Sequence, residues 1–180
     1  MFDWLCKVES NVILYSEKVR VSNLQKICPS IIVSYNYASI ISEDVIRYMN
    51  QNIINLHISY LPYNRGAQPN FWSFIENTPK GVTVHKIDKG LDTGNILFQK
   101  ELLLDETKET FSTSYQHLHE EIQKLFMDNW VKIKNNHYEE YVQSGRGSYH
   151  TMKDFYTYTE NKQVDWNEKI IDYKERNHLI

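Results

Sequence analysis

The sequence predicts an α/β fold built on a Rossmann-like open sheet whose strands are mostly parallel. Short runs of β-branched and aromatic residues alternate with segments whose apolar residues recur every three or four positions, as expected for strands followed by helices. Polar residues gather where several predicted strands end, which is where such sheets bind ligands. At 180 residues, the chain is long enough for one domain with a substantial core.

The N-terminal third predicts two strands and two helices. Residues 11–15 (NVILY) and 31–35 (IIVSY) are the strand candidates, and residues 21–27 between them carry apolar side chains at helical spacing. A second helix is predicted over residues 42–50, because Ser42 can cap it and two acidic residues occupy its first turn.

The middle of the chain predicts three more strands. Residues 53–58 (IINLHI) form an apolar run too short for a helix, which suits a buried parallel strand. Residues 59–66 contain one proline and one glycine and are expected to form a loop. Residues 81–87 and 96–104 are two further strand candidates, joined by a turn with two glycines.

One long amphipathic helix is predicted over residues 111–133, because apolar side chains recur there every three to four positions. We assign this apolar face to the core. After Tyr141 the sequence becomes irregular, and the polar residues 169–180 are expected to fray.

Composition excludes several classes of partner. The formal net charge is −3, so a broad basic surface for nucleic acid is not expected. Cys6 and Cys28 lack the spacing of a disulfide framework or a zinc site, which fits a reducing cytoplasm. No apolar run approaches the roughly 20 residues of a membrane span, and residues 1–10 carry charges where a signal peptide is apolar. We expect a cytoplasmic protein that binds neither nucleic acid nor membrane and needs no metal.

Three polar residues form a candidate catalytic set. Asn55 and His57 are two apart on a predicted strand, so their side chains share one face, and Asp92 lies on the glycine-bounded turn. An amide donor, a base near neutral pH and an orienting carboxylate suit acyl transfer to an amine. No serine or cysteine nucleophile elbow is present, which favours direct attack by the amine. On spacing alone, a structural role for His57 remains open.

The order and spacing of these residues resemble the motif set of folate-dependent formyltransferases. That family includes glycinamide ribonucleotide transformylase, methionyl-tRNA formyltransferase and the sugar N-formyltransferases. The resemblance covers residues 31–104 and rests on NLHIS at 55–59, Leu61-Pro62, Gly66, His85 and GLDTG at 90–94.

The resemblance implies a role for each residue of the set. His57 would be the general base, Asn55 would polarise the formyl oxygen, and Asp92 would be the partner of His57 and of an ordered water. The donor would be N10-formyltetrahydrofolate or its N5 isomer, with its pterin between the loop after the second predicted strand and the glycine turn. The implied donor-binding residues are Tyr35, Asn36, Tyr37, Asp88, Gly90 and Leu91.

Within the family, the segment after the catalytic strand is most similar to enzymes that formylate nucleotide-linked amino sugars for bacterial surface glycans such as lipopolysaccharide O-antigen. Aromatic faces, amides and an arginine suit a stacked base, sugar hydroxyls and a diphosphate. The alternative is that Phe71 and Trp72 belong to the core and that Arg65 is solvated. The expected substrate contacts are Tyr63, Arg65, Gln68, Asn70 and Trp72.

The two rival substrates fit the sequence less well. Methionyl-tRNA formyltransferase normally adds a basic C-terminal domain, and the ribonucleotide enzyme holds phosphate on a glycine-rich N-terminal loop. The sequence offers neither feature, so an amino sugar is preferred.

The resemblance also divides the chain into a formyltransferase catalytic domain over residues 1–140 and a C-terminal extension over residues 141–180, packed on the substrate side. The family's first strand has no counterpart before Asn11, and residues 1–8 correspond to the remainder of the first helix. A second hypothesis is therefore an N-terminally truncated, non-catalytic remnant or binding module, which turnover would distinguish. A homodimer is compatible with the sequence.

Overall fold

The computed structural model describes residues 1–179 and is organised around a sheet of four strands in the order β1-β2-β4-β5. β1 and β2 are parallel, and β4 runs antiparallel to both of its neighbours. Three of the four strands therefore run in one direction, which confirms the Rossmann-like α/β class and identifies β4 as the reversed strand. The strands are β1 (Ile32–Tyr35), β2 (Ile53–His57), β4 (Lys80–Lys86) and β5 (Ile96–Leu102).

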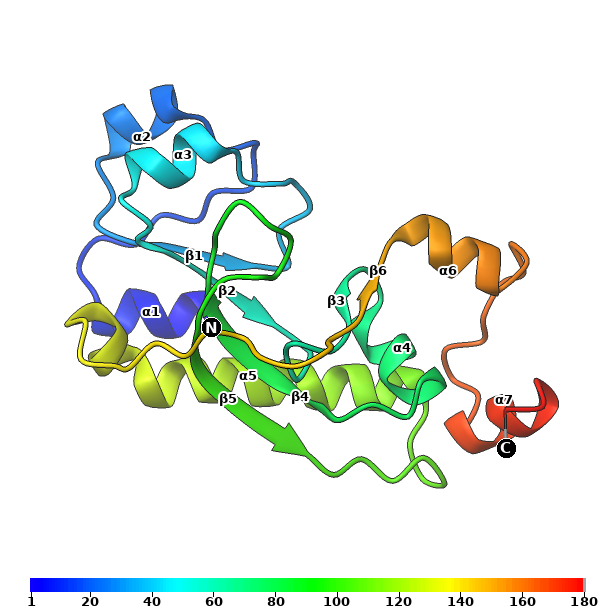
Figure 1. Cartoon of the computed structure of the whole chain (residues 1–180). Coiled ribbons are helices and arrows are strands. Elements are labelled where there is room, and N and C mark those ends of the chain that lie inside the picture. Colours follow the sequence, from blue (N-terminus) through cyan, green and yellow to red (C-terminus); the bar gives the residue numbers. More distant parts are fainter. Residues whose placement is uncertain (180) are drawn as a thin grey trace.

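Helices cover the sheet on both faces. In Figure 1, α5 and α1 lie together on one face of the sheet. Helices α2 and α3 lie on the opposite side of β1, and α6 and α7 lie beyond α4 at the far end of the molecule. A second sheet pairs β3 (Arg65–Gly66) with β6 (Tyr149–His150). The helices are α1 (Phe2–Val8), α2 (Val21–Ile27), α3 (Glu43–Tyr48), α4 (Pro69–Ile75), α5 (Phe111–Lys134), α6 (Met152–Tyr158) and α7 (Ile170–Arg176).

The main core lies between α5 and the sheet. The helix begins at a capping box, in which Thr110 and Thr113 exchange side-chain and backbone hydrogen bonds. Its apolar face is buried as predicted, and each large side chain that it buries contributes about 1.5–3 kcal/mol. The residues that meet there include Ile54, Leu56, Val82, Val84, Leu118, Ile122 and Phe126.

The strand predicted over residues 11–15 is not formed. This segment is irregular, and it makes no backbone hydrogen bond to any described residue. Ile13 and Leu14 are 60% and 71% exposed, although their residue types favour a strand. A strand needs a neighbour to complete its hydrogen bonds, and a cavity separates this segment from β1.

The C-terminal residues fold, which corrects the expectation of irregular and fraying chain. Phe155 of α6 and Ile170 and Tyr173 of α7 join a second core with aromatic residues of α4 and with Phe111. The ammonium of Lys174 is buried and contacts Glu106 at 2.9 Å. Long-range packing therefore orders a segment whose local sequence is polar. Ile180 lies outside the described residues.

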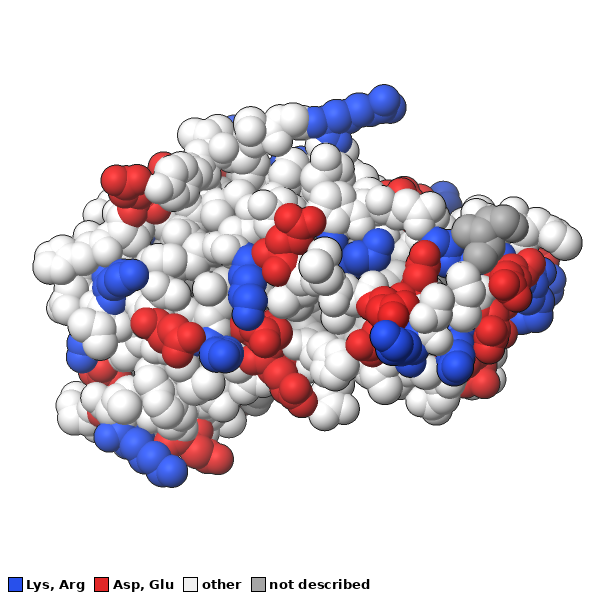
Figure 2. All heavy atoms as spheres, turned by 90° about the horizontal axis from the view of Figure 1, so that it is seen from below, with Lys and Arg blue, Asp and Glu red and all other residues white. Residues whose placement is uncertain are grey.

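Surface charge is mixed on the face shown in Figure 2, where acidic and basic side chains alternate without a continuous basic area. Among residues 1–179, no helix is both long enough and apolar enough to cross a bilayer.

Candidate active site

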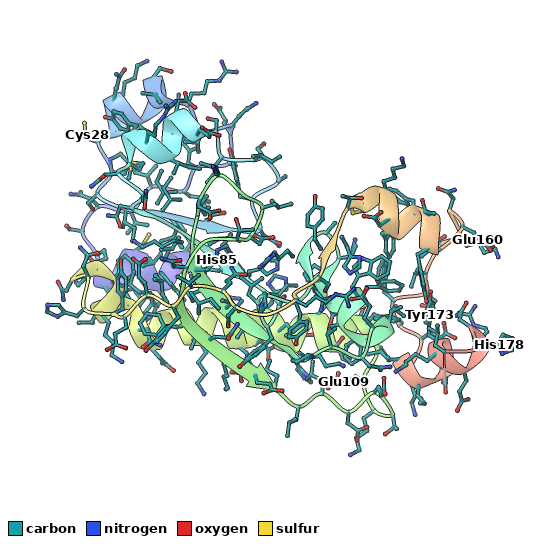
Figure 3. All side chains as sticks on the ribbon, in the orientation of Figure 1. Cys28, His85, Glu109, Glu160, Tyr173 and His178 are labelled. Carbon is teal, nitrogen blue, oxygen red and sulfur yellow. The ribbon has the colours of Figure 1, made fainter. Side chains whose placement is uncertain are left out.

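The central strands β2 and β4 bring three of the polar side chains to one face of the sheet. Asn55 and His57 are two residues apart on β2, so their side chains lie on the same face of the sheet. The antiparallel register places His85 directly opposite Asn55. His57 and His85 are buried, with ring centroids 6.1 Å apart. Figure 3 shows His85 in the middle of the molecule, near the base of the β4–β5 loop.

The β4–β5 loop supplies the carboxylate. The Asp88 carboxylate accepts hydrogen bonds from the Gly90 N–H at 3.0 Å and the Thr93 hydroxyl at 2.6 Å, which closes the turn. A Cβ atom at Gly94 would lie 1.9 Å from the Lys86 carbonyl oxygen, so only glycine fits there. Asp92 adopts a left-handed φ of 53°, and the loop directs it back over β2.

Asp92 is the centre of the cluster. Its Oδ1 accepts a hydrogen bond from Asn55 Nδ2 at 3.3 Å and lies 3.6 Å from His85 Nε2. Its Oδ2 accepts the backbone N–H of Gly66 at 2.9 Å and lies 3.8 Å from His57 Nδ1. One carboxylate therefore connects β2, β4 and β3.

Opposing effects act on the pKa of Asp92. Burial favours the neutral acid, but the attraction that His57 exerts when it is protonated, the contact with His85 and the hydrogen bond from Gly66 outweigh it. The net result is a pKa far below the usual value, so the carboxylate stays ionised at neutral pH.

Burial favours the neutral form of His57, in which one ring nitrogen is free to act as a base. Its Nε2 lies 3.3 Å from the Asn64 carbonyl oxygen, which can only accept, so we assign the ring proton to Nε2 and the lone pair to Nδ1. Burial lowers the pKa of His57, opposed by the charge of Asp92, and His85 lowers it further. Nδ1 can accept a proton, and Asp92 would stabilise the imidazolium that forms.

Three further groups complete the site, and none of them had a role in the sequence-based catalytic set. His85 belonged to the motif pattern, and here its Nδ1 donates to the Lys86 carbonyl at 2.7 Å, which directs Nε2 to Asn55 and Asp92. The backbone N–H of Gly66 could not be identified from the sequence, because the candidate residues were chosen by their side chains. Gln143 lies about 50 residues from the turn that it contacts, so no local signal identified it.

Gln143, in the segment that follows α5, contacts the β4–β5 loop. Its Nε2 donates to the carbonyl oxygens of Asp92 at 2.9 Å and Gly94 at 2.8 Å. Its Oε1 accepts both Nε–H and Nη2–H of Arg65, at 3.1 and 2.8 Å. All polar atoms of its amide are therefore engaged.

The structure divides the five expected substrate contacts into two groups. Tyr63, Arg65 and Gln68 are partly exposed, and Arg65 is held beside the site by Gln143. Asn70 is buried, and its amide donates to the Phe111 carbonyl and the Ser114 hydroxyl, both at 3.0 Å.

Trp72 is also buried, and its ring stacks on His150 at 4.0 Å. Asn70 and Trp72 lie in α4, which packs in the second core, so the structure does not bring them to the exposed surface beside the site. Phe71 lies in this core as well.

The expected donor-binding segments offer free backbone groups. The side chains of Tyr35 and Tyr37 are engaged, with His119 at 2.7 Å and with the backbone of Val19 at 2.9 Å. The backbone of residues 36–38 makes no hydrogen bond to a described residue, and in residues 88–91 only the Gly90 N–H does. Leu91 is 44% exposed. Free donors and acceptors beside an exposed apolar side chain fit a flat heteroaromatic ring such as a pterin.

Within the described part of the chain, no group of three or more His, Cys, Asp and Glu side chains is arranged to hold a metal ion. The cluster contains a buried imidazole, a carboxylate and an amide at the end of a central strand. Groups of this kind are chemically suited to activate an amine for group transfer.

Comparison with known proteins gives the family. Residues 11–129 match the formyl transferase family, and the chain belongs to it. The fold is similar to that of the formyltransferase PseJ from Anoxybacillus kamchatkensis, solved with UDP-4,6-dideoxy-4-formamido-L-AltNAc and tetrahydrofolate. The two are 41% identical with a TM-score of 0.85, over 93% of this chain and 90% of that chain.

Other relatives are more distant. A sugar N-formyltransferase from Shewanella is 25% identical with a TM-score of 0.70, over 82% of this chain and 57% of that chain. Methionyl-tRNA formyltransferase of Anaeromyxobacter dehalogenans is 38% identical over 107 residues, which are 56% of this chain and 34% of that protein. The chain spans about a third of the length of such curated relatives.

Proposed function

We propose that this protein transfers a formyl group from formyltetrahydrofolate, as the N10 or N5 isomer, to the amine of a nucleotide-linked amino sugar. The observation that carries the proposal is the convergence of Asn55, His57 and His85 on the ionised Asp92 at the end of β2. The likeness to the Anoxybacillus enzyme, whose structure holds a formamido sugar nucleotide and tetrahydrofolate, supports this choice of donor and acceptor.

The chemistry begins with the neutral amine of the sugar. Its nitrogen attacks the formyl carbon, a C–N bond forms, and the formyl oxygen becomes an oxyanion. His57 Nδ1 takes the proton that the attacking nitrogen loses, and Asp92 stabilises the resulting imidazolium. Collapse of the intermediate breaks the bond between the formyl carbon and the folate nitrogen, which then takes up the proton.

Asn55 is the proposed donor to the oxyanion. Its Nδ2 contacts Asp92 and His85, each at 3.3 Å, which is longer than an average N–H···O hydrogen bond. Long contacts of this kind in a ligand-free site can be exchanged for a stronger one in the transition state. One amide hydrogen can therefore turn to the oxyanion while the other keeps Asp92 in place.

We propose that Tyr63, Arg65 and Gln68 contact the acceptor. They lie on the segment between β2 and α4, which carries the Gly66 N–H that binds Asp92. Arg65 can pair with a diphosphate, and Tyr63 can stack on a sugar or a base. We also propose that residues 1–140 form the catalytic domain and that the extension, residues 141–180, covers the acceptor side. The contacts of Gln143 support this arrangement.

A non-catalytic binding module of the same family is a second candidate. The observation that favours it is the open cavity beside β1, which leaves one edge of the central sheet incomplete. A module of this kind would bind formyl-folate without turning it over.

The test supplies formyl-folate with three kinds of acceptor and follows the added formyl group by mass spectrometry. The acceptors are a panel of UDP- and dTDP-linked amino sugars, glycinamide ribonucleotide and charged initiator tRNA. We expect formyl transfer to an amino sugar only. Transfer to either other acceptor would contradict the substrate assignment, and donor binding without transfer to any acceptor would favour the binding module.

A further inference from the structure

The segment that leads into β6 contacts the loop after β2, next to the strand pairing of β3 with β6 (Figure 1). The N–H of Ser148 donates to the Pro62 carbonyl at 3.2 Å, and the Ser148 carbonyl accepts the N–H of Arg65 at 3.0 Å. A Cβ atom at Gly147 would lie 2.1 Å from the Pro62 carbonyl oxygen, so the two backbones are in direct contact. This close packing brings the hydroxyl of Ser148 to Asn64.

Asn64 is completely buried, and each of its polar groups has a partner. Its N–H donates to the Ser148 hydroxyl at 2.9 Å, and its Oδ1 accepts from the same hydroxyl at 3.0 Å. Its Nδ2 donates to the Thr78 hydroxyl at 2.7 Å. Its backbone carbonyl is the group that lies 3.3 Å from His57 Nε2. Two hydroxyls from distant parts of the chain therefore hold the residue that contacts the proposed base.

The backbone of Asn64 needs this support. Asn64 adopts a left-handed φ of 53°. Residues other than glycine keep such a conformation only where the surrounding structure fixes it. The direction of the Asn64 carbonyl depends on this conformation, so the contacts with Ser148 and Thr78 keep the carbonyl aimed at His57.

This carbonyl decides which ring nitrogen of His57 carries the proton. Nδ1 lies 3.8 Å from Asp92 Oδ2, and a carboxylate attracts an N–H group. Asp92 therefore favours a proton on Nδ1, which would leave no lone pair on that nitrogen for an incoming amine. The Asn64 carbonyl opposes this effect, because it can only accept a hydrogen bond and so favours the proton on Nε2.

We infer that Ser148 and Thr78 are positioning residues for His57: through Asn64 they hold the imidazole in the tautomer whose Nδ1 is free to take a proton. Neither side chain touches the reacting atoms. The consequence for catalysis rests on the proposed formyl transfer, whereas the tautomer of His57 can be measured without any substrate.

The test observes the two ring nitrogens of His57 by NMR of protein labelled with isotopic nitrogen in histidine. Ser148→Ala and Thr78→Val each remove one hydroxyl that holds Asn64. We expect either change to raise the ratio of the Nδ1–H to the Nε2–H tautomer about fivefold to tenfold, the factor that one ordinary hydrogen bond contributes. Thr78→Ser keeps a hydroxyl and should restore the ratio of the unsubstituted chain.

The pKa of His57 and the kinetics give two further readouts. Burial lowers the pKa of His57, the charge of Asp92 raises it, His85 lowers it, and the hydrogen bond to the Asn64 carbonyl raises it. Loss of that hydrogen bond should therefore lower the pKa of His57 further in Ser148→Ala. Turnover with an amino-sugar acceptor should fall about 10–10²-fold, the effect of a small misplacement of a reacting group, with little change in KM for the donor.

Two controls separate positioning from a general loosening of the fold. Ser144→Ala makes the same substitution at an exposed position of the same segment, and it should leave the NMR signals of His57 unchanged. His85 is an internal reference, because its Nδ1–H donates to the Lys86 carbonyl at 2.7 Å. The tautomer of His85 should therefore be the same in every variant.

The outcomes distinguish this inference from the proposed function. An unchanged tautomer ratio of His57 in the folded variants would overturn the inference even if turnover falls, because Ser148 and Thr78 would then be merely structural. An equal change at His85 would overturn it as well. The expected change at His57 in a chain that formylates no acceptor would support the positioning role and contradict the proposed function. If one variant does not fold, the other decides.

Discussion

The side-chain amide of Gln143 donates a hydrogen bond to the backbone carbonyl of Asp92 at 2.9 Å. This contact joins a residue of the C-terminal extension to the turn that carries the central carboxylate. The oxygen of the same amide accepts two hydrogen bonds from the Arg65 guanidinium. One side chain therefore holds both the β4–β5 loop and Arg65, which we propose contacts the acceptor.

Gln143→Ala should lower kcat about tenfold, because the turn would lose two hydrogen bonds and Asp92 its fixed position. Gln143 does not touch the reacting atoms in the proposed mechanism, so it is a positioning residue. KM for the acceptor should rise as well, since Arg65 loses its partner. Steady-state kinetics measure both effects. Gln116→Ala, at an exposed position on α5, is the matched control and should leave both constants unchanged.

His57→Ala and Asp92→Ala should each reduce turnover by about 10²–10⁴, the usual contribution of a general base or its partner. Both residues lie at a strand end or in a loop, so circular dichroism should show an intact fold. His117→Ala is the control, because that histidine is half exposed on α5. A rate close to that of the unsubstituted protein in either site variant would remove the proposed mechanism.

Asn55→Ala should reduce kcat by about 10²–10³, the usual cost of losing one donor to an oxyanion, with a smaller effect on acceptor KM. The separation of the two constants tests the role. A change confined to KM would make Asn55 a binding residue. Nuclear magnetic resonance of His57 should accompany the kinetics, to verify that Asp92 and His57 keep their contact.

The pKa of His57 in the folded protein should lie below its ordinary value of 6.5, because burial disfavours the imidazolium. Asp92→Asn should lower this pKa further, since the carboxylate is the charge that opposes the shift. A titration followed by NMR of labelled histidine measures both values. A pKa of His57 that rises in Asp92→Asn would contradict the arrangement.

The same shift has a consequence for stability. Because the unfolded state binds a proton at His57 more readily than the folded state, the free energy of unfolding should fall as the pH drops below 6.5, until His57 is protonated in the folded state as well.

Lys174→Met should destabilise the fold by about 1–3 kcal/mol, because it leaves Glu106 without its buried partner and removes a hydrogen bond to Asn77. The estimate is modest because the Glu106 side chain is 33% exposed. Denaturant unfolding measures the change. Lys162→Met, at a side chain 77% exposed, is the control and should have little effect. A Lys174→Met variant as stable as the unsubstituted protein would show that the buried pair does not anchor α7.

Local sequence determined most of the sheet and its main helix. The apolar runs at 31–35 and 53–58 form strands, and the periodic residues 111–133 form α5. In each case the spacing of the apolar side chains along the chain itself indicates the type of element, so no knowledge of its neighbours was needed. Sequence also predicted that Asn55 and His57 share a face and that Asp92 could reach them. Strand geometry and glycine turns are short-range properties, so the closeness of these three side chains could be predicted from them, whereas the family was indicated by the resemblance of the whole motif set.

Tertiary structure decided what depends on distant partners. Residues 11–15 have the composition of a strand but lack a neighbour, whereas the polar segment at 170–176 became a helix because Ile170 and Tyr173 found a core to enter. His85 and Gln143 gained their places at Asp92 through strand register and a long-range contact. Asn70 is buried in the core, where its side-chain amide donates a hydrogen bond to the hydroxyl of Ser114. Hydrogen bonds and burial between residues far apart in sequence leave no local pattern, so only the folded chain specifies them.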